Sequence, residues 1–388
     1  MRGRVLIAEG LNDRAALAAC RALYSAGWEV GVASYPGAGL AAASRSVSAR
    51  HRSVPPERDL DRFVEHINAA IRQGAYEVVF PGYSDSELMA LSLRREEIDA
   101  AVPFAPHETV VRSLDKLELT WAAATAGLAA PETVEANDSE LERRQPPYVI
   151  KQRTHARFDS GRGTSRIATR IIEDRDEGRR MVERIRRQGG TPLLQEAIEG
   201  NLIAFVAFMS RDGRLRARAQ QKAERIWPPR SGFSSRSRTV AVEDDLSARV
   251  EALLQDFGWF GIAELQFLAR PGRPPTLIDL NGRFYGSLAL AVSADLNLPA
   301  MWAAEATGRT AAGGVARPGV RYQWLEGDLR RALVERRCGL VHDLLETLRV
   351  AAKDTVHSIW DRRDPFPFVR AVGLLVRRGW RRLTGRSV

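Results

Sequence analysis

A predicted hairpin within residues 262–290 constrains the fold of this chain more than any other segment. The segment reads IAELQFLARPGRPPTLIDLNGRFYGSLAL. Pro271-Gly272 is a strong turn signal, and on each side of it apolar and polar residues alternate as they do in β-strands. The sequence therefore predicts two antiparallel strands joined at this turn.

Four side chains that carry oxygen atoms are expected to gather on one face of this hairpin. Because successive strand residues point to opposite faces, Glu264 and Gln266 share a face of the first strand. Asp279 and Asn281 share a face of the second strand for the same reason. If position 269 pairs with position 276, the hairpin has two opposed pairs, Gln266 with Asp279 and Glu264 with Asn281.

This cluster of oxygen atoms has two interpretations. Hard cations such as Mg²⁺ prefer carboxylate and amide oxygens, and Mg²⁺ often bridges them to the phosphates of a nucleotide. Arg283 follows the second strand, and its guanidinium could donate two parallel hydrogen bonds to a phosphate. Alternatively, Asn281-Gly282 is a common hairpin-turn dipeptide, and the polar face is simply solvated.

Length and composition predict a cytoplasmic protein of more than one domain. The chain has 388 residues, enough for two or three domains, and its hydrophobic content of 44% indicates a folded, soluble protein. Cys20 and Cys338 match no metal or redox spacing, so we expect reduced thiols. A strand at residues 4–8 begins without a charged and then apolar leader, and no apolar run reaches transmembrane length.

The net charge of +10 is concentrated at the C-terminal end of the chain. No acidic residue follows Asp364, and the basic residues after it are Arg370, Arg377, Arg378, Arg381, Arg382 and Arg386. Apolar residues recur there at helical spacing, at Val369, Val372, Val376, Trp380 and Leu383. This pattern predicts an amphipathic helix that either contacts a membrane surface or packs on its own domain. Nucleic acid is not expected as a partner, because no aromatic and basic platform accompanies the charge.

The order of predicted elements indicates a parallel sheet in the N-terminal part of the chain. Residues 1 to about 105 alternate between apolar strands and helical patterns, and no GxGxxG follows the first strand. Lys151 ends an apolar strand, and residues 160–165 form a Gly-rich loop whose amides would cover a phosphate. A solvated lysine and a flexible surface loop are the alternatives.

Read in order, several motifs resemble the ATP-grasp superfamily, and more closely its carboxylate–amine ligase branch related to the large subunit of carbamoyl-phosphate synthase. The resemblance covers roughly residues 5 to 310. It rests on Leu114-Asp115-Lys116 with the Gly-Leu-Ala-Ala-Pro segment at 127–131, the strand at 148–151, the segment at 195–200, the segment at 221–235, and Ile278 to Ser287. Asp279 stands where the family commonly has Glu, Gln266 where many members have Glu, and Gly282 where proline is common; none of these changes removes a ligand oxygen.

The resemblance implies an α/β (α+β) fold. We expect a parallel-sheet domain preceding the ATP-grasp unit at 1–110, the small ATP-grasp lobe at 111–194, the large lobe with the metal site at 195–312, and a helical C-terminal extension at 313–388.

The resemblance also implies roles for individual residues. Lys116 and Lys151 would neutralise ATP phosphates. The remaining nucleotide contacts would come from Gln195, Glu196, Ile198, Glu199, Gly161 and Gly163. The ligands of Mg²⁺, or of Mn²⁺ in its place, would be Gln266, Asp279 and Asn281, with Glu264 supporting them. Catalytic contacts to the phosphates or to the substrate carboxylate would come from Arg283, Lys222 and Arg225.

The reaction implied by the resemblance converts a carboxylate and ATP to an acyl phosphate and ADP, and an amine then attacks to form an amide. Small-molecule carboxylates and amines are the expected partners, together with ATP, and a homodimer is an open alternative to a monomer. The competing hypothesis is a catalytically weak, ATP-binding regulatory protein that its basic tail recruits to the membrane surface.

Overall fold

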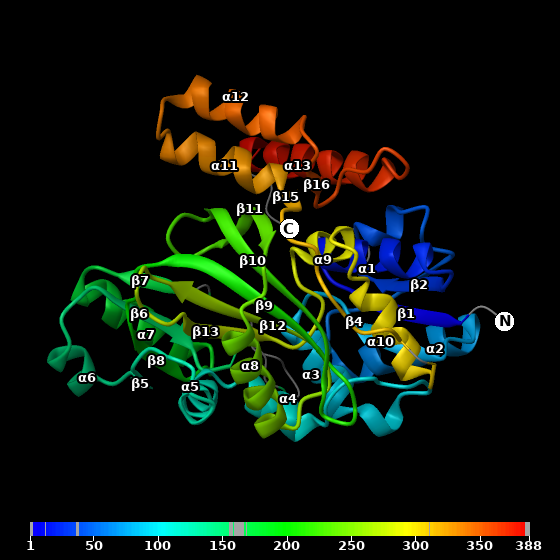
Figure 1. Ribbon diagram of the computed structural model, residues 1–388, viewed down its shortest axis with the longest axis horizontal. Coiled ribbons are helices and arrows are strands. Elements are labelled where there is room, and N and C mark those ends of the chain that lie inside the picture. The colour runs from blue at the N-terminus through cyan, green and yellow to red at the C-terminus, as the bar shows by residue number, and fades with distance from the viewer. Residues whose placement is uncertain are drawn as a thin grey trace.

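The computed structural model describes residues 3–11, 13–35, 39–154, 158, 167, 169–309 and 311–384. Within these ranges the strands form three sheets that follow one another along the chain, as the colours in Figure 1 show. Helices pack between and around the sheets, which confirms the predicted α/β (α+β) class. The expected Gly161 and Gly163 contacts lie outside the described residues.

The N-terminal sheet is parallel, as predicted. Its strands are β1 (Arg4–Glu9), β2 (Glu29–Ser34), β3 (Ala49–Arg52) and β4 (Val78–Pro81), in the order β3-β2-β1-β4. The helices of this region are α1 (Arg14–Ser25), α2 (Leu60–Gly74) and α3 (Asp85–Leu93), with short 3₁₀ helices η1 (Ala41–Ala43) and η2 (Arg95–Glu97). Strands β1 and β4 are almost wholly buried, because helices cover both faces of a parallel sheet.

The second sheet is small and antiparallel and has its own core. Helices α4 (His107–Leu114) and α5 (Lys116–Thr125) lead into it. Its strands are β5 (Thr133–Glu135), β6 (Tyr148–Gln152), β7 (Arg170–Ile172) and β8 (Pro192–Glu196), in the order β5-β8-β6-β7, with helices α6 (Asp138–Arg143) and α7 (Arg175–Arg187). Ile150, Ile185 and Leu194 are fully buried in a cluster separate from the main core.

The third sheet is the largest and shares its core with the N-terminal sheet. Its order is β13-β12-β9-β10-β11-β15-β16, and β14 pairs with β10. The strands are β9 (Asn201–Met209), β10 (Leu215–Trp227), β11 (Phe233–Val240), β12 (Gly261–Ala269), β13 (Thr276–Asn281), β14 (Gly314–Val315), β15 (Arg321–Gln323) and β16 (Val356–His357). The associated helices are α8 (Asp244–Phe257), α9 (Leu288–Ser293) and α10 (Leu298–Ala306). One continuous apolar cluster runs from β1 and β4 to β9 and β12, so these two sheets form one packed body.

The C-terminal region supplies strands as well as the predicted helices. Helices α11 (Leu325–Glu335) and α12 (Leu340–Ala351) confirm the expectation, while β15 and β16 extend the large sheet. Asp328 on α11 is fully buried and accepts from the Arg236 Nη2 atom of β11 at 2.6 Å. Removing one partner of such a pair is costly, because a buried charge is left uncompensated. This contact therefore anchors α11 to the sheet.

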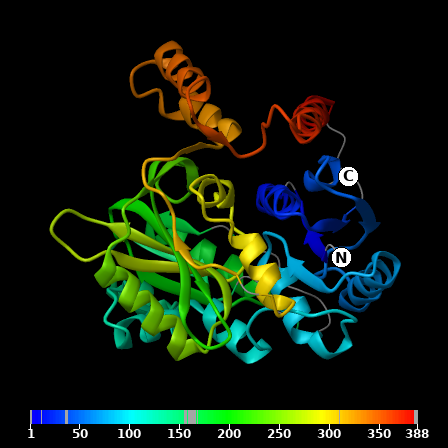
Figure 2. The same cartoon turned by 45° about the vertical axis from the view of Figure 1, so that its right-hand side comes forward.

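Helix α13 (Phe366–Thr384) packs on the chain with one side and leaves another side open. Phe368, Ala371 and Leu374 lie against the main core, whereas Val369 and Val376 are each 63% exposed. Figure 2 shows α13, in red, over the N-terminal region in blue and apart from α11 and α12. No helix among the described residues is both long and apolar enough to cross a membrane.

Candidate active site

The predicted register of the hairpin holds at the four polar residues. Gln266 pairs with Asp279, and Glu264 pairs with Asn281. Nearer the turn, however, Leu268 rather than Ala269 pairs with Thr276, and a bulge between Gln266 and Phe267 restores the expected register. The bulge accommodates one extra residue in β13. A register counted outward from the turn does not predict such a bulge.

Glu264 organises the two amide side chains of the cluster. It is only 6% exposed, and its Oε2 atom accepts from Gln266 Nε2 at 3.2 Å and from Asn281 Nδ2 at 3.0 Å. Burial raises the pKa of the Glu264 carboxyl from 4.5 to about 7, against the lowering effect of these hydrogen bonds. The supporting position expected for Glu264 therefore agrees with its contacts.

Two lysines from different elements converge on β13. Lys116, the first residue of α5, is 3% exposed and forms an ion pair with Asp279. Lys151, at the end of β6, is 5% exposed and donates from Nζ to the Ile278 carbonyl oxygen at 3.3 Å. Burial, together with the neighbouring Lys116 charge, lowers the pKa of Lys151 to about 7. The site thus places beside the hairpin one lysine that is paired with an acid and a second lysine that loses its proton easily.

The predicted adenine segment links two sheets. Gln195, Glu196, Ile198 and Glu199 lie where β8 of the small sheet passes into β9 of the large sheet. Gln195 is buried and donates from Nε2 to the Thr133 hydroxyl at 2.7 Å, while Glu196 and Glu199 are exposed. The segment therefore lies where the chain passes between the two sheets, and its contact with adenine stays a prediction.

Arg283 joins the hairpin to the N-terminal region. It is 2% exposed, and it donates from Nε to Asp85 at 2.7 Å and from Nη2 to Asn281 Oδ1 at 2.9 Å. Its guanidinium also lies over the Tyr83 ring, 4.6 Å from the centroid. These contacts give Arg283 a positioning role toward Asn281, and its predicted contact with a phosphoryl group stays a prediction.

The structure does not bring Lys222 and Arg225 into this cluster. Ala204 of β9 pairs with both Gln266 of β12 and Gln221 of β10, so these two glutamines lie in one row across the sheet. Gln221 is 4% exposed and donates to the Ser287 hydroxyl at 2.7 Å. Lys222 is next along the strand, so it points to the other face and is exposed. Arg225 forms an ion pair with Glu346 of α12. The β10 side chain that reaches the pocket is therefore Gln221, one residue before the predicted Lys222.

A small pocket adjoins the oxygen cluster. Its volume is about 30 Å³, and its walls come from both the N-terminal region and the large sheet. The lining residues are Arg14, Tyr83, Leu202, Ala204, Gln221, Phe233, Ser234, Glu264, Gln266, Asn281, Gly286 and Ser287. Sequence reasoning missed Arg14 and Tyr83, because they follow strands far apart in the chain and belong to no local motif.

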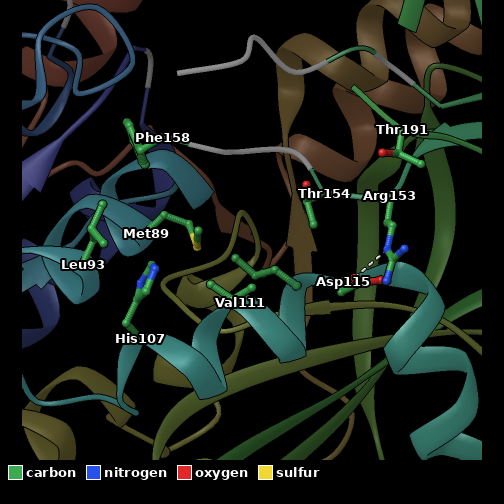
Figure 3. Close-up of a pocket in the computed structure, with 10 residues that line it drawn as sticks. Met89, Leu93, His107, Val111, Asp115, Arg153, Thr154, Phe158 and Thr191 are labelled. Carbon is green, nitrogen blue, oxygen red and sulfur yellow. Dashed lines mark hydrogen bonds and ion pairs between the residues drawn. The ribbon is translucent and has the colours of Figure 1, made fainter. Parts of the chain in front are cut away.

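A larger cavity of about 450 Å³ lies beside Asp115 and Arg153. Figure 3 shows Met89, Leu93, His107 and Val111 facing the end of the small sheet across it. Arg153 donates there from Nε to Asp115 at 2.7 Å, and Asp115 also caps the helix that begins with Lys116. None of the predicted catalytic or metal residues lines this cavity.

Comparisons with known proteins agree on one architecture. A family model described as "ATP-grasp in the biosynthetic pathway with Ter operon" matches residues 208–328. A search of curated protein sequences gave no match.

Three solved structures illustrate the likeness. An L-amino acid ligase from Bacillus licheniformis is 14% identical with a TM-score of 0.58, over 79% of this chain and 75% of that chain. The biotin carboxylase domain of the Hydrogenobacter thermophilus 2-oxoglutarate carboxylase, solved with MgADP, is 16% identical with a TM-score of 0.64, over 83% and 73%. An N5-carboxyaminoimidazole synthetase from Staphylococcus aureus, complexed with ADP, is 13% identical with a TM-score of 0.59, over 81% and 80%. At these identities the likeness concerns the fold.

Lys151 is expected to make the free energy of unfolding depend on pH. Its pKa is about 7 in the folded protein and near 10.5 in the unfolded chain, so between these values the unfolded chain binds more protons. Stability then rises with pH across this range, by at most about 1.4 kcal/mol per pH unit. In Lys151→Met the free energy of unfolding, measured by urea denaturation, should no longer rise with pH, whereas in Lys222→Met it should still rise. An equal rise in wild type and Lys151→Met would contradict the lowered pKa.

Proposed function

We propose that this chain, which has the ATP-grasp fold predicted from its motifs, is an enzyme that activates a carboxylate with ATP and joins it to an amine. The observation that carries the proposal is the convergence of Lys116 and Lys151 on the strand that presents Asp279 and Asn281. Asp279 pairs with Lys116, and nucleotide phosphates would supply further negative charge, which favours the protonated form of Lys151.

The oxygen atoms of the hairpin fit a metal that is bound together with a nucleotide. Among the described residues, no group of three or more His, Cys, Asp or Glu side chains is arranged to hold a metal by itself. Mg²⁺ usually takes one or two carboxylates and completes its shell with water and phosphate oxygens. Asp279, with Gln266 and Asn281, would supply that limited set, and Mn²⁺ has the same ligand preference. The metal would neutralise charge on the phosphates.

The chemistry of the proposed reaction requires positioning more than covalent catalysis. A carboxylate oxygen of the substrate attacks the γ-phosphorus of ATP, and ADP leaves with the electrons of the broken bond. The amine nitrogen then attacks the acyl carbon of the acyl phosphate, loses a proton, and inorganic phosphate leaves. Lys116 and Lys151 would hold the phosphates, and Arg283 would orient Asn281, so most of the rate enhancement comes from fixed charges and geometry.

The structures that this chain resembles support ATP as the nucleotide. One of them carries MgADP and another carries ADP, and a third is named as an L-amino acid ligase. By analogy we propose ATP and Mg²⁺ for this chain. The likeness does not indicate which carboxylate or which amine this chain would use. A homodimer is a separate proposal, measurable by sedimentation equilibrium.

The direct test is release of ADP from MgATP in the presence of a panel of carboxylates and amines. We expect turnover in wild type and at least about a tenfold loss of kcat/KM in Gln221→Ala, which removes a buried side chain of the pocket. Lys222→Ala is the matched control from the same strand and should stay near wild type. Tight ATP binding without turnover for any acid and amine would reject the ligase and favour the regulatory protein.

Contact with a membrane surface is a second, independent proposal. It is motivated by Val369, Val372 and Val376, which are exposed on α13 in a segment rich in arginine. We expect wild type to sediment with anionic liposomes and Val372→Ser/Val376→Ser to lose this binding. Val334→Ser, which changes an exposed valine of α11, is the control. Wild type that stays in the supernatant would reject the contact.

A further inference from the structure

Arg14 is a cation in the small pocket that has no acidic partner among the described residues. It is the first residue of α1, and its Nη1 atom donates to the Tyr322 hydroxyl at 3.4 Å. Its guanidinium lies over the Trp324 ring, 3.8 Å from the centroid. These neighbours hold the side chain in place but leave its charge unbalanced. A partly buried arginine of this kind is suited to bind an anion.

The position of Arg14 in the fold is one where ligands bind. It follows β1, and Tyr83 follows β4, which is the neighbour of β1 in the order β3-β2-β1-β4. The chain passes from β1 to β2 on one side, while β4 lies on the other side, so the strand order reverses at this point. In open parallel sheets, ligands bind at the carboxyl ends of the strands at such a reversal.

A buried acid fixes the start of α1, which carries Arg14, and the loop that carries Tyr83. The Asp13 side chain accepts from the Ala16 amide at 2.7 Å, which caps α1, and from the Tyr83 amide at 2.8 Å. Asp13 is 1% exposed, so water competes little for these bonds. Arg14 is therefore presented to the pocket by a preorganised backbone.

The space around the guanidinium suits a group of carboxylate size. At Gly286 an added Cβ would lie 3.2 Å from Arg14 Nη2, so the absence of a side chain leaves room for the arginine. Tyr83 and Phe233 form an aromatic wall, with ring centroids 6.3 Å apart. The pocket volume of about 30 Å³ admits only a small group in this conformation.

Arg14 is separate from the cations that face the proposed phosphate site. Lys116 and Lys151 contact β13 at Asp279 and Ile278. Arg14 instead contacts residues of the 286–324 region, including Tyr322 and Trp324. The third cation of the site, Arg283, is already paired with Asp85. An anion at Arg14 would therefore be distinct from the phosphates.

We propose that Arg14 binds a second carboxylate of the acid substrate and so makes the site selective for dicarboxylic acids, including acidic amino acids. This inference rests on the proposed function. The reacting carboxylate would lie toward Gln266 and Asn281, and the second carboxylate would accept hydrogen bonds from the guanidinium. A dicarboxylic acid is larger than the pocket of about 30 Å³, so the pocket must widen on binding, and Tyr83 and Phe233 would then contact the carbon atoms between the two groups.

The test compares acids that differ only in the second carboxylate. Glutarate is paired with pentanoate, and glutamate with norvaline, in the ADP-release assay with a fixed amine. We expect the dicarboxylic member to have at least about a tenfold higher kcat/KM, equivalent to about 1.4 kcal/mol. Arg14→Gln should raise its KM by a similar factor while the KM for ATP stays the same. Arg14→Lys, which keeps the charge, should recover part of the loss.

Two controls separate this inference from a structural effect and from the proposed function. Arg62→Gln, which changes an exposed arginine of α2, should leave every KM unchanged. If no acid elicits ADP release, the ligase proposal fails, and binding of glutarate is then measured by NMR. Glutarate binding to wild type that Arg14→Gln abolishes would support the anion site. Equal use of both members of each pair, an unchanged KM in Arg14→Gln, or no difference in glutarate binding would overturn it.

Discussion

The buried ion pair between Arg283 and Asp85 is the contact on which the arrangement of the site depends. Both side chains are almost fully buried, so neither charge can be left without its partner at low cost. Because Arg283 also binds Asn281, it fixes the hairpin relative to the N-terminal sheet. The small pocket has one wall from each of these two parts, and its shape exists only while they are held together.

Charge is divided among three places around the hairpin. Lys116 and Lys151 contact β13, and Arg283 is paired with Asp85. Arg14, at the start of α1, has no acidic partner among the described residues. Glu264 lies between them and orients the two amides. This division separates a region suited to phosphates from a region suited to a substrate carboxylate. Both assignments follow from charge and burial and remain proposals.

The sequence could predict the part of the site that depends on the alternation of apolar and polar residues along the two hairpin strands. The pairing of Gln266 with Asp279 was predicted because strand periodicity and a turn determine it, whereas the bulge that restores this register was not. The motif predicted Lys222 for the site, whereas the adjacent Gln221 faces the pocket, because a motif does not specify which of two adjacent residues points inward. Arg14 was not predicted because only the tertiary fold brings the start of α1 beside Gly286. The packing of one side of α13 on the main core could not be predicted either, because the residues that it contacts lie far away in the sequence.

The central claim is that the hairpin oxygens bind Mg²⁺ together with a nucleotide, and calorimetric titration of ADP tests it most directly. We expect wild type to bind ADP at least about tenfold more tightly with Mg²⁺ than without it. In Asp279→Asn the dependence on Mg²⁺ should disappear, while metal-free ADP binds at least as tightly, because a negative charge beside the phosphates has been removed. The same Mg²⁺ dependence in both proteins would contradict the account and leave the hairpin with a structural role only.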